Sequence, residues 1–345
     1  SAGPVTGSEV IAGGILKPGM GVVIPGRRPD VPYTGEEFMN NVRFAITQEP
    51  DFIALSFVGT VRDIRDARKI LQDENGENIP LIAKIESREA VDHLEDIISG
   101  ADGIMVARGD LGVELPIEQV PHIQKEIISR CNHQGIPVIT ATEMLESMAK
   151  HSRPTRAEVT DVANAIIDGT DATMLSGETS IGVNPALAVR TMNNIALETE
   201  QHLPYLRMLN ERAAWHEKSV EGIISYRACF IAEELKSPAI VAFTRSGLTA
   251  ERVSRCRPRA PVFAITPERS VARRLLLRWG IQPVLADPVR TADELFSLST
   301  WITRQTKTAV PGDQLVIIAG NFAGKEGRTN MIKVQEIPQE PDSPR

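Results

Sequence analysis

The chain has 345 residues and a formal net charge of −7, with 42% apolar and 24% charged residues. This composition is that of an ordinary globular protein and excludes a disordered chain, a collagen and a coiled-coil rod. The length favours two domains, and the acidic balance argues against nucleic acid as the main partner. Apolar runs are far shorter than a membrane span, so no membrane partner is expected. Three widely spaced cysteines fit a reducing, cytoplasmic location better than a disulfide framework.

Five apolar, β-prone segments alternate with helical patterns in the first part of the chain. They are Phe52–Val58, Pro80–Glu86, Gly103–Arg108, Ile136–Thr142 and Ala172–Ser176. Apolar residues at helical spacing follow each segment, with Thr60, Ser87, Thr155 and Asn184 placed as N-caps. Strands that are apolar throughout and alternate with helices are typical of a parallel sheet buried on both faces. The sequence therefore predicts an α/β fold.

Residues 201–218 are rich in charge and break this alternation, so we expect a connecting segment there. A second α/β domain is predicted over residues 219–337, beginning with a long helix at about Val220–Leu235. A loose tail is expected over residues 338–345. The predicted strands of this domain are Ala239–Thr244, Pro261–Thr266, Pro283–Ala286, Gln314–Ala319 and Met331–Gln335, with helices near 248–256, 268–279 and 291–307.

Polar residues follow four of the first five predicted strands. Lys84 and Glu86 are two residues apart and should point to the same face. Gly109 and Asp110 follow the next strand, Thr142 the one after, and a Ser-Gly-Glu run the fifth. Each of these polar runs, taken alone, is explained by an exposed ion pair or by a turn. Four such runs in succession favour a polar site, because the carboxyl ends of parallel strands lie at the same edge of the sheet.

These residue types indicate a class of reaction. Two carboxylates with room for water and substrate oxygens are the hard ligands that Mg²⁺ prefers. A lysine, a backbone N–H made approachable by Gly109 and the hydroxyl of Thr142 would add positive charge and hydrogen bonds. Such a set suits a carboxylate–enolate substrate or a transferring phosphoryl group.

A second candidate site lies in the predicted C-terminal domain. The run Thr244–Thr249 follows a strand and opens a helix, where backbone N–H groups and hydroxyls form a cradle for phosphate. The glycine-rich segment Gly320–Thr329, with Lys325 and Arg328, could close over the same ligand. Residues 245–278 hold nine Arg against two Glu, which fits an anionic ligand. The alternative is a solvated helical face and two ordinary surface loops.

Five segments carry longer motifs: Ile82–Ser87, Met105–Gly112, Thr140–Met148, Arg153–Glu158 and Met174–Thr179. In this order they resemble the pyruvate kinase family, and the resemblance runs from about residue 13 to residue 336. It implies a (β/α)₈ TIM barrel with a small lid domain, followed by an α/β effector and oligomerisation domain. It also implies phosphoryl transfer from phosphoenolpyruvate to ADP in glycolysis, giving pyruvate and ATP. Mg²⁺ (or Mn²⁺) and K⁺ are the implied cofactors, and a cytoplasmic homotetramer with a phosphorylated effector is the implied assembly.

The resemblance also assigns roles to residues. Lys84 would stabilise charge on the phosphoryl group and the enolate, and Glu86 and Asp110 would bind Mg²⁺. The backbone N–H groups of Gly109 and Asp110 would hold the substrate carboxylate. Thr142 would contact the substrate and help to relay a proton to the enolate carbon. The residues that match the family's effector phosphate loop are Thr244, Arg245, Ser246 and Thr249.

Two departures from the family pattern stand out. Residues 1–30 are expected to form only a remnant of the lid domain and the return to the barrel, and residues 31–200 supply five βα units instead of eight, without the K⁺ ligands. Met20 stands where the family often has a basic residue near the nucleotide, and Val23 where Asn is common. We therefore keep two alternatives: a chain inactive alone that serves as an effector-binding or assembly module, and another phosphoenolpyruvate- or pyruvate-using barrel lyase.

Overall fold

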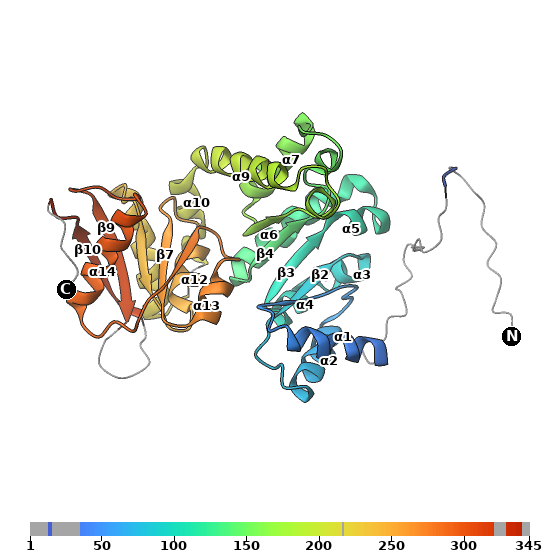
Figure 1. The fold of residues 1–345 in the computed structure, drawn as a ribbon, viewed down its shortest axis with the longest axis horizontal. Helices are drawn as coiled ribbons and strands as arrows, with labels where there is room; N and C mark the ends of the chain where they lie inside the picture. The colour runs from blue at the N-terminus through green and yellow to red at the C-terminus, as the bar shows by residue number, and fades with distance from the viewer. Residues whose placement is uncertain (1–12, 16–34, 216, 321–328, 340–345) are drawn as a thin grey trace.

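The computed structural model of the chain describes residues 13–15, 35–215, 217–320 and 329–339. Its strands form two separate five-stranded sheets that lie side by side, each with its own helices (Figure 1). Nearly all of the expected lid remnant, Met20 and Val23 among it, lies outside the described residues, as does the middle of the Gly320–Thr329 loop.

The first sheet is parallel throughout, and its strands follow chain order. In the described part of the chain it is open, with the first and fifth strands at its edges. Lys84 lies opposite Met105 in the register of the second and third strands. The strands are β1 (Ile53–Leu55), β2 (Leu81–Ile85), β3 (Gly103–Ala107), β4 (Val138–Ala141) and β5 (Ala172–Met174).

Helices alternate with the strands of this sheet, and the four predicted caps Thr60, Ser87, Thr155 and Asn184 are all N-cap residues. The Ser87, Thr155 and Asn184 side chains each accept an N–H at the start of a helix. The helices are α1 (Glu36–Thr47), α2 (Val61–Asp73), α3 (Arg88–Asp92), α4 (Leu94–Gly100), α5 (Arg108–Glu114), α6 (Val120–Gln134), α7 (Arg156–Asp168), α8 (Gly177–Ser180) and α9 (Pro185–Gln201), with 3₁₀ turns η1 (Ile117–Gln119) and η2 (Glu146–Ala149).

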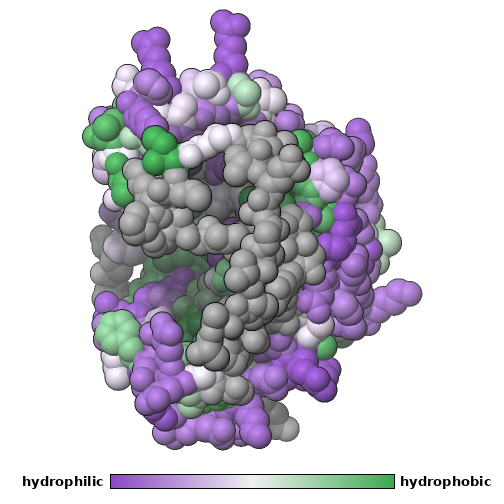
Figure 2. Space-filling view, turned by 90° about the vertical axis from the view of Figure 1, so that its right-hand side faces the viewer, coloured by the Kyte–Doolittle hydropathy of each residue, from purple (hydrophilic) through white to green (hydrophobic). Residues whose placement is uncertain are grey.

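The core of this unit is continuous from the helices to the sheet. Ile127 and Ile128 of α6 are fully buried against strand residues such as Ile104 and Val138. Each such side chain contributes roughly 1.5–3 kcal/mol on burial. Polar side chains dominate the outer face of this end of the molecule, and apolar ones gather there only in small groups (Figure 2).

The second sheet has the order β10-β9-β6-β7-β8, with only β10 antiparallel to its neighbour. Helices α10 to α13 share a core cluster with one face, and α14 packs on the other. The elements are α10 (Tyr205–Glu211), η3 (Arg212–Ala214), α11 (Val220–Glu234), β6 (Ile240–Phe243), α12 (Leu248–Arg255), β7 (Val262–Thr266), α13 (Arg269–Leu275), β8 (Ile281–Leu285), α14 (Ala292–Gln305), β9 (Gln314–Gly320) and β10 (Thr329–Glu336).

The α/β class and all ten predicted strands are confirmed, with ends that shift by a few residues. Helices α5, α8 and α10 are among those that the sequence did not predict. Helix α5 occupies the Gly109–Asp110 run, for which a turn was the alternative to a site, and its Leu111 is buried in the core. Helix α10 falls in the segment predicted to connect the domains, where Tyr205, Met208 and Leu209 are buried despite the charged residues around them. None of the described helices is long and apolar enough to cross a bilayer.

Candidate active site

Lys84 and Glu86 form a pair at the carboxyl end of β2. Lys84 is the fourth residue of this five-residue strand, and Glu86 is the first residue after the strand ends. The two residues are two positions apart, so their side chains share one face. Lys84 Nζ contacts Glu86 Oε1 in an ion pair. The glutamate side chain is only 3% exposed, whereas that of Lys84 is 23% exposed. The lysine is therefore the accessible partner of a carboxylate that the fold holds in place.

The end of the neighbouring strand β1 fixes both members of this pair. Lys84 Nζ donates to Ser56 Oγ at 3.0 Å, and the backbone N–H of Phe57 donates to Glu86 Oε2 at 2.5 Å. Phe57 has φ +57°, a left-handed backbone that costs a bulky residue of order 1–3 kcal/mol. No local pattern in the sequence points to Ser56 or Phe57, because only the β1–β2 register brings them beside Lys84.

Gly109 and Thr142 meet across the ends of β3 and β4. The backbone N–H of Gly109 donates to Thr142 Oγ1 at 2.8 Å, and the Thr142 hydroxyl donates to the Ala141 carbonyl at 2.7 Å. A Cβ at position 109 would lie 3.4 Å from Thr142 Oγ1, at the border of ordinary van der Waals contact. The structure thus brings together two residues that the sequence predicted for one site. A substrate carboxylate at the Gly109 N–H would share that donor with Thr142.

Arg108 holds the strained turn that contains Thr142. Thr142 and Glu143 have φ values of +66° and +52°, two consecutive left-handed residues. The Arg108 guanidinium donates to the Thr142 carbonyl at 2.7 Å and to the Glu143 carbonyl at 2.9 Å. It is neutralised by Asp161 of α7 at 2.6 Å and is itself buried. Arg108 is a positioning residue that sequence reasoning missed, although an arginine ending an apolar strand was a signal.

Glu86 and Asp110 are the two carboxylates that the sequence predicts for a magnesium ion. The strands before them, β2 and β3, are hydrogen-bonded neighbours, so both residues lie at the same edge of the sheet. Asp110 is exposed in the first turn of α5, and Glu86 is buried beside Lys84. Among the described residues no group of three or more His, Cys, Asp or Glu side chains could hold a metal alone. Two carboxylates completed by substrate oxygens and water are, however, the usual protein share of a Mg²⁺ site.

The remaining motifs at this edge of the sheet have structural contacts. Glu178 is 1% exposed and accepts the backbone N–H groups of Leu145 at 2.9 Å and Ser176 at 2.8 Å. It therefore ties the segment after β4 to the end of β5. Glu158 completes a capping box with Thr155 and also accepts the Ser147 hydroxyl at 2.6 Å. These carboxylates shape the loops around Thr142.

The predicted effector loop lies between β6 and α12. Thr244 Oγ1 accepts the N–H of Gly247 at 2.8 Å, and Gly247 has φ +95°, which favours glycine. Thr249 is buried, and its hydroxyl contacts that of Thr329 at 2.6 Å. Arg245 and Ser246 are exposed at the tip. The four predicted residues therefore divide into two hydroxyls that hold the loop and two side chains that a ligand could reach.

The position of this loop in the sheet favours ligand binding. From β6 the chain runs to β7 and β8 on one side and then returns to β9 on the other. The ends of β6 and β9 thus flank the point where strand order reverses, and open α/β sheets bind ligands at that point. The hydroxyls of Thr249, in the first turn of α12, and Thr329, at the start of β10, join the segments that follow these two strand ends. Lys325 and Arg328 lie outside the described residues.

Comparisons with known proteins match both parts of the chain. A family model of the pyruvate kinase barrel domain matches residues 5–189, and one of the pyruvate kinase alpha/beta domain matches residues 223–335. Pyruvate kinase of Clostridium acetobutylicum is 44% identical over 94% of this chain and 68% of its own length. Those of Staphylococcus haemolyticus and Geobacillus stearothermophilus are 43% and 45% identical over 96% of this chain. The chain spans 57% and 56% of the length of these two relatives. The chain belongs to the pyruvate kinase family.

Proposed function

We propose that this chain carries the site of a phosphotransferase that converts phosphoenolpyruvate and ADP to pyruvate and ATP in glycolysis. The observation that carries the proposal is the pairing of predicted site residues at one sheet edge: Lys84 with Glu86, and Gly109 with Thr142. The curated relatives that share this sequence are named pyruvate kinase. The boundaries we propose are a barrel portion over 31–200, a connecting segment over 201–218 and an effector domain over 219–337.

Lys84 is the residue we expect to act on the reacting groups. Its ammonium is partly exposed and is fixed by Glu86 and Ser56, so it can neutralise charge on the phosphoryl group and then on the enolate oxygen. Because the lysine is already held in place, little reorganisation is needed as that charge develops. Phosphoryl transfer depends chiefly on such positioning and electrostatic stabilisation.

Glu86 and Asp110 are the residues we propose to hold Mg²⁺, or Mn²⁺ in its place. When bound, the metal supplies further positive charge to the phosphoryl oxygens. The backbone N–H groups of Gly109 and Asp110 would orient the substrate carboxylate. The Thr142 hydroxyl, which lies beside the Gly109 N–H, would contact the substrate and take part in moving a proton to the enolate carbon. K⁺ is proposed as the second cofactor.

The C-terminal sheet is proposed to bind a phosphorylated effector. Arg245, Ser246 and the N–H groups at the start of α12 would contact its phosphate, while Thr244 and Thr249 keep the loop in shape. The proposed assembly is a cytoplasmic homotetramer.

The direct experiment measures pyruvate formation by the chain from phosphoenolpyruvate, ADP and Mg²⁺, with and without K⁺. We expect turnover that falls by about 100-fold or more in Lys84→Ala, because the lysine stabilises the transition state. Lys69→Ala is the matched control, since Lys69 is exposed on α2. A folded chain that forms no pyruvate, or full activity in Lys84→Ala, would refute the proposal for this chain.

A further inference from the structure

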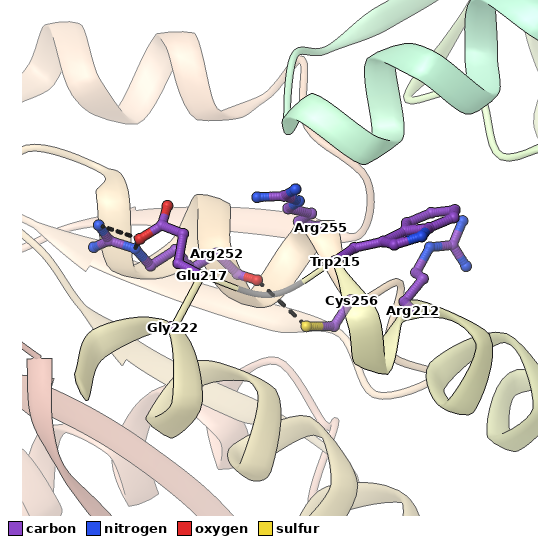
Figure 3. A pocket seen from close by; sticks show the side chains of 7 residues that line it. All are labelled: Arg212, Trp215, Glu217, Gly222, Arg252, Arg255 and Cys256. Atoms are coloured by element: carbon purple, nitrogen blue, oxygen red, sulfur yellow. Dashed lines mark hydrogen bonds and ion pairs between the residues drawn. The ribbon is translucent and has the colours of Figure 1, made fainter. Parts of the chain in front are cut away.

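A small pocket lies where α11 and α12 meet the turn after η3. Its lining includes Trp215, the cationic side chains of Arg212, Arg252 and Arg255, and the thiol of Cys256. Figure 3 shows Cys256 between the Arg252–Glu217 ion pair on one side and Trp215 with Arg212 on the other. Neither the proposed active site nor the effector loop uses this pocket. Cys256, which is only 6% exposed, contributes to its wall.

A second thiol lies beside the first. Cys229 of α11 and Cys256 at the end of α12 belong to the same core cluster and are 1% and 6% exposed. The Cys229 thiol has two acceptors within reach, the Cys256 sulfur and the Val253 carbonyl at 3.7 Å. The Cys256 thiol lies 3.5 Å from the Arg252 carbonyl. The fold therefore brings together two cysteines that the sequence analysis treated as widely spaced.

The surroundings of the two thiols differ in charge. The hydrogen bond from Cys229 and the guanidinium groups of Arg212, Arg255 and Arg257 lower the pKa of Cys256, although its burial opposes them. Burial raises the pKa of Cys229. Arg212 keeps its charge at neutral pH, because burial lowers its pKa only to about 10. The guanidinium groups therefore favour the thiolate form of Cys256, which lines the pocket, over that of Cys229.

We propose that Cys256 is an oxidation site that reacts with a hydroperoxide, and that Cys229 converts the product into a disulfide joining α11 to α12. A cysteine that lines a pocket beside guanidinium groups and lies next to a second thiol resembles the arrangement of a redox-sensing cysteine pair. The remaining cysteine is not such a site. Cys131 is fully buried in α6, and burial raises its pKa.

The chemistry is a two-electron oxidation in two steps. The Cys256 thiolate attacks one peroxide oxygen, so that an S–O bond forms, the O–O bond breaks, and the leaving oxygen takes a proton as water or an alcohol. The resulting sulfenic acid is attacked by the Cys229 sulfur, which gives up its proton. The S–S bond forms, the S–O bond breaks, and the departing hydroxide leaves as water. The two thiols are oxidised and the peroxide is reduced.

The test treats the folded full chain with hydrogen peroxide at neutral pH and maps thiols and disulfides by mass spectrometry. The wild type and the control Cys131→Ser should lose two hydrogens and show a Cys229–Cys256 peptide. Cys229→Ser should stop at a sulfenic acid on Cys256 that dimedone traps. Cys256→Ser should keep its thiols. Two results would overturn the proposal. One is thiol loss in Cys256→Ser at the wild-type rate. The other is a folded wild type that keeps all three thiols under conditions in which the unfolded chain reacts.

A second measurement does not depend on the folding of the cysteine variants. Alkylation of Cys256 in the wild type, followed against pH, should show a midpoint below that of a free thiol, about 8.5. Arg255→Gln should move the midpoint upward and leave the rate at high pH unchanged, since it removes charge and not access. A midpoint at or above the free-thiol value would contradict the assignment of Cys256 as the reactive thiol.

Discussion

Arg257 and Asp171 form an ion pair in which both side chains are only 3% exposed. Arg257 follows α12 of the second sheet, and Asp171 directly precedes β5 of the first, so the pair joins the two units. The two terminal nitrogens of the Arg257 guanidinium, Nη1 and Nη2, donate to the Asp171 carboxylate at 2.7 and 2.9 Å. Nη2 also donates to the Gly169 carbonyl at 3.0 Å. The backbone N–H groups of Trp279 and Val138 also donate to Asp171, each at 3.1 Å. The contact between the units therefore includes a charge pair that is almost fully desolvated.

Asp171→Asn should destabilise the chain strongly. The amide keeps the shape of the carboxylate but leaves the Arg257 charge buried without a counter-charge, and breaking such a pair costs about 3–5 kcal/mol. Urea unfolding of the variant and the wild type measures the loss. The control is Glu74→Gln, which breaks the exposed ion pair with Arg43 and should leave the unfolding free energy nearly unchanged. Equal stability of Asp171→Asn and wild type would show that the buried pair is not needed.

The contribution of Asp171 should depend on pH. Burial alone would raise the pKa of Asp171, but Arg257, Arg278 and the Trp279 N–H together hold this pKa below its usual value. The pKa is thus lower in the folded chain than in the unfolded one, where it is about 4. The stabilisation is fully present above that value and is lost as pH falls through the folded-state pKa. The stability difference between wild type and Asp171→Asn should shrink below about pH 4; a constant difference in acid would be the contrary result.

Thr142→Val should impair both turnover and stability. Valine keeps the branched shape but cannot accept the Gly109 N–H or contact substrate through a hydroxyl. An unsatisfied N–H costs about 1–3 kcal/mol. Thr142→Ser should restore most of both properties. Thr160→Val on the exposed face of α7 serves as the control. Steady-state pyruvate assays and thermal unfolding report the two effects, and wild-type turnover in Thr142→Val would remove the hydroxyl from the mechanism.

The strands and the residues at their ends could be predicted because both signals are local. Apolar runs identify the strands, and the parallel topology then brings Lys84, Gly109 and Thr142 to one edge. Contacts that depend on packing could not be predicted in this way. Arg108 contacts carbonyls 34 and 35 residues away, and Arg257 contacts Asp171 86 residues away. A single sequence carries no sign of which distant carbonyl or carboxylate will meet an arginine.

Glu178→Gln should loosen the edge of the sheet beside Thr142. The carboxylate accepts two backbone N–H groups, and an amide nitrogen in place of one oxygen would face a donor instead of an acceptor. We expect a stability loss of about 1–3 kcal/mol and lower turnover. Hydrogen exchange at Leu145 and Ser176 measures the loosening directly. Glu198→Gln, a change at an exposed position of α9, is the control. Unchanged exchange at both N–H groups would show that the carboxylate does not hold these loops.

Ser246→Asp should abolish the response to a phosphorylated effector. Ser246 is exposed between Arg245 and the left-handed Gly247, so a carboxylate there would repel a phosphate at the start of α12 without disturbing the Thr244–Gly247 hydrogen bond. Effector binding by calorimetry, with fructose bisphosphate or a nucleotide as the probe, should fall at least 10-fold, while turnover without effector stays the same. Ser297→Asp, equally exposed on α14 across the sheet, controls for added charge. If Ser246→Asp binds the probe as the wild type does, the phosphate site is not this loop. The hydroxyls of Thr244 and Thr249 would then have only a structural role, which is to hold the loop through the contacts described above.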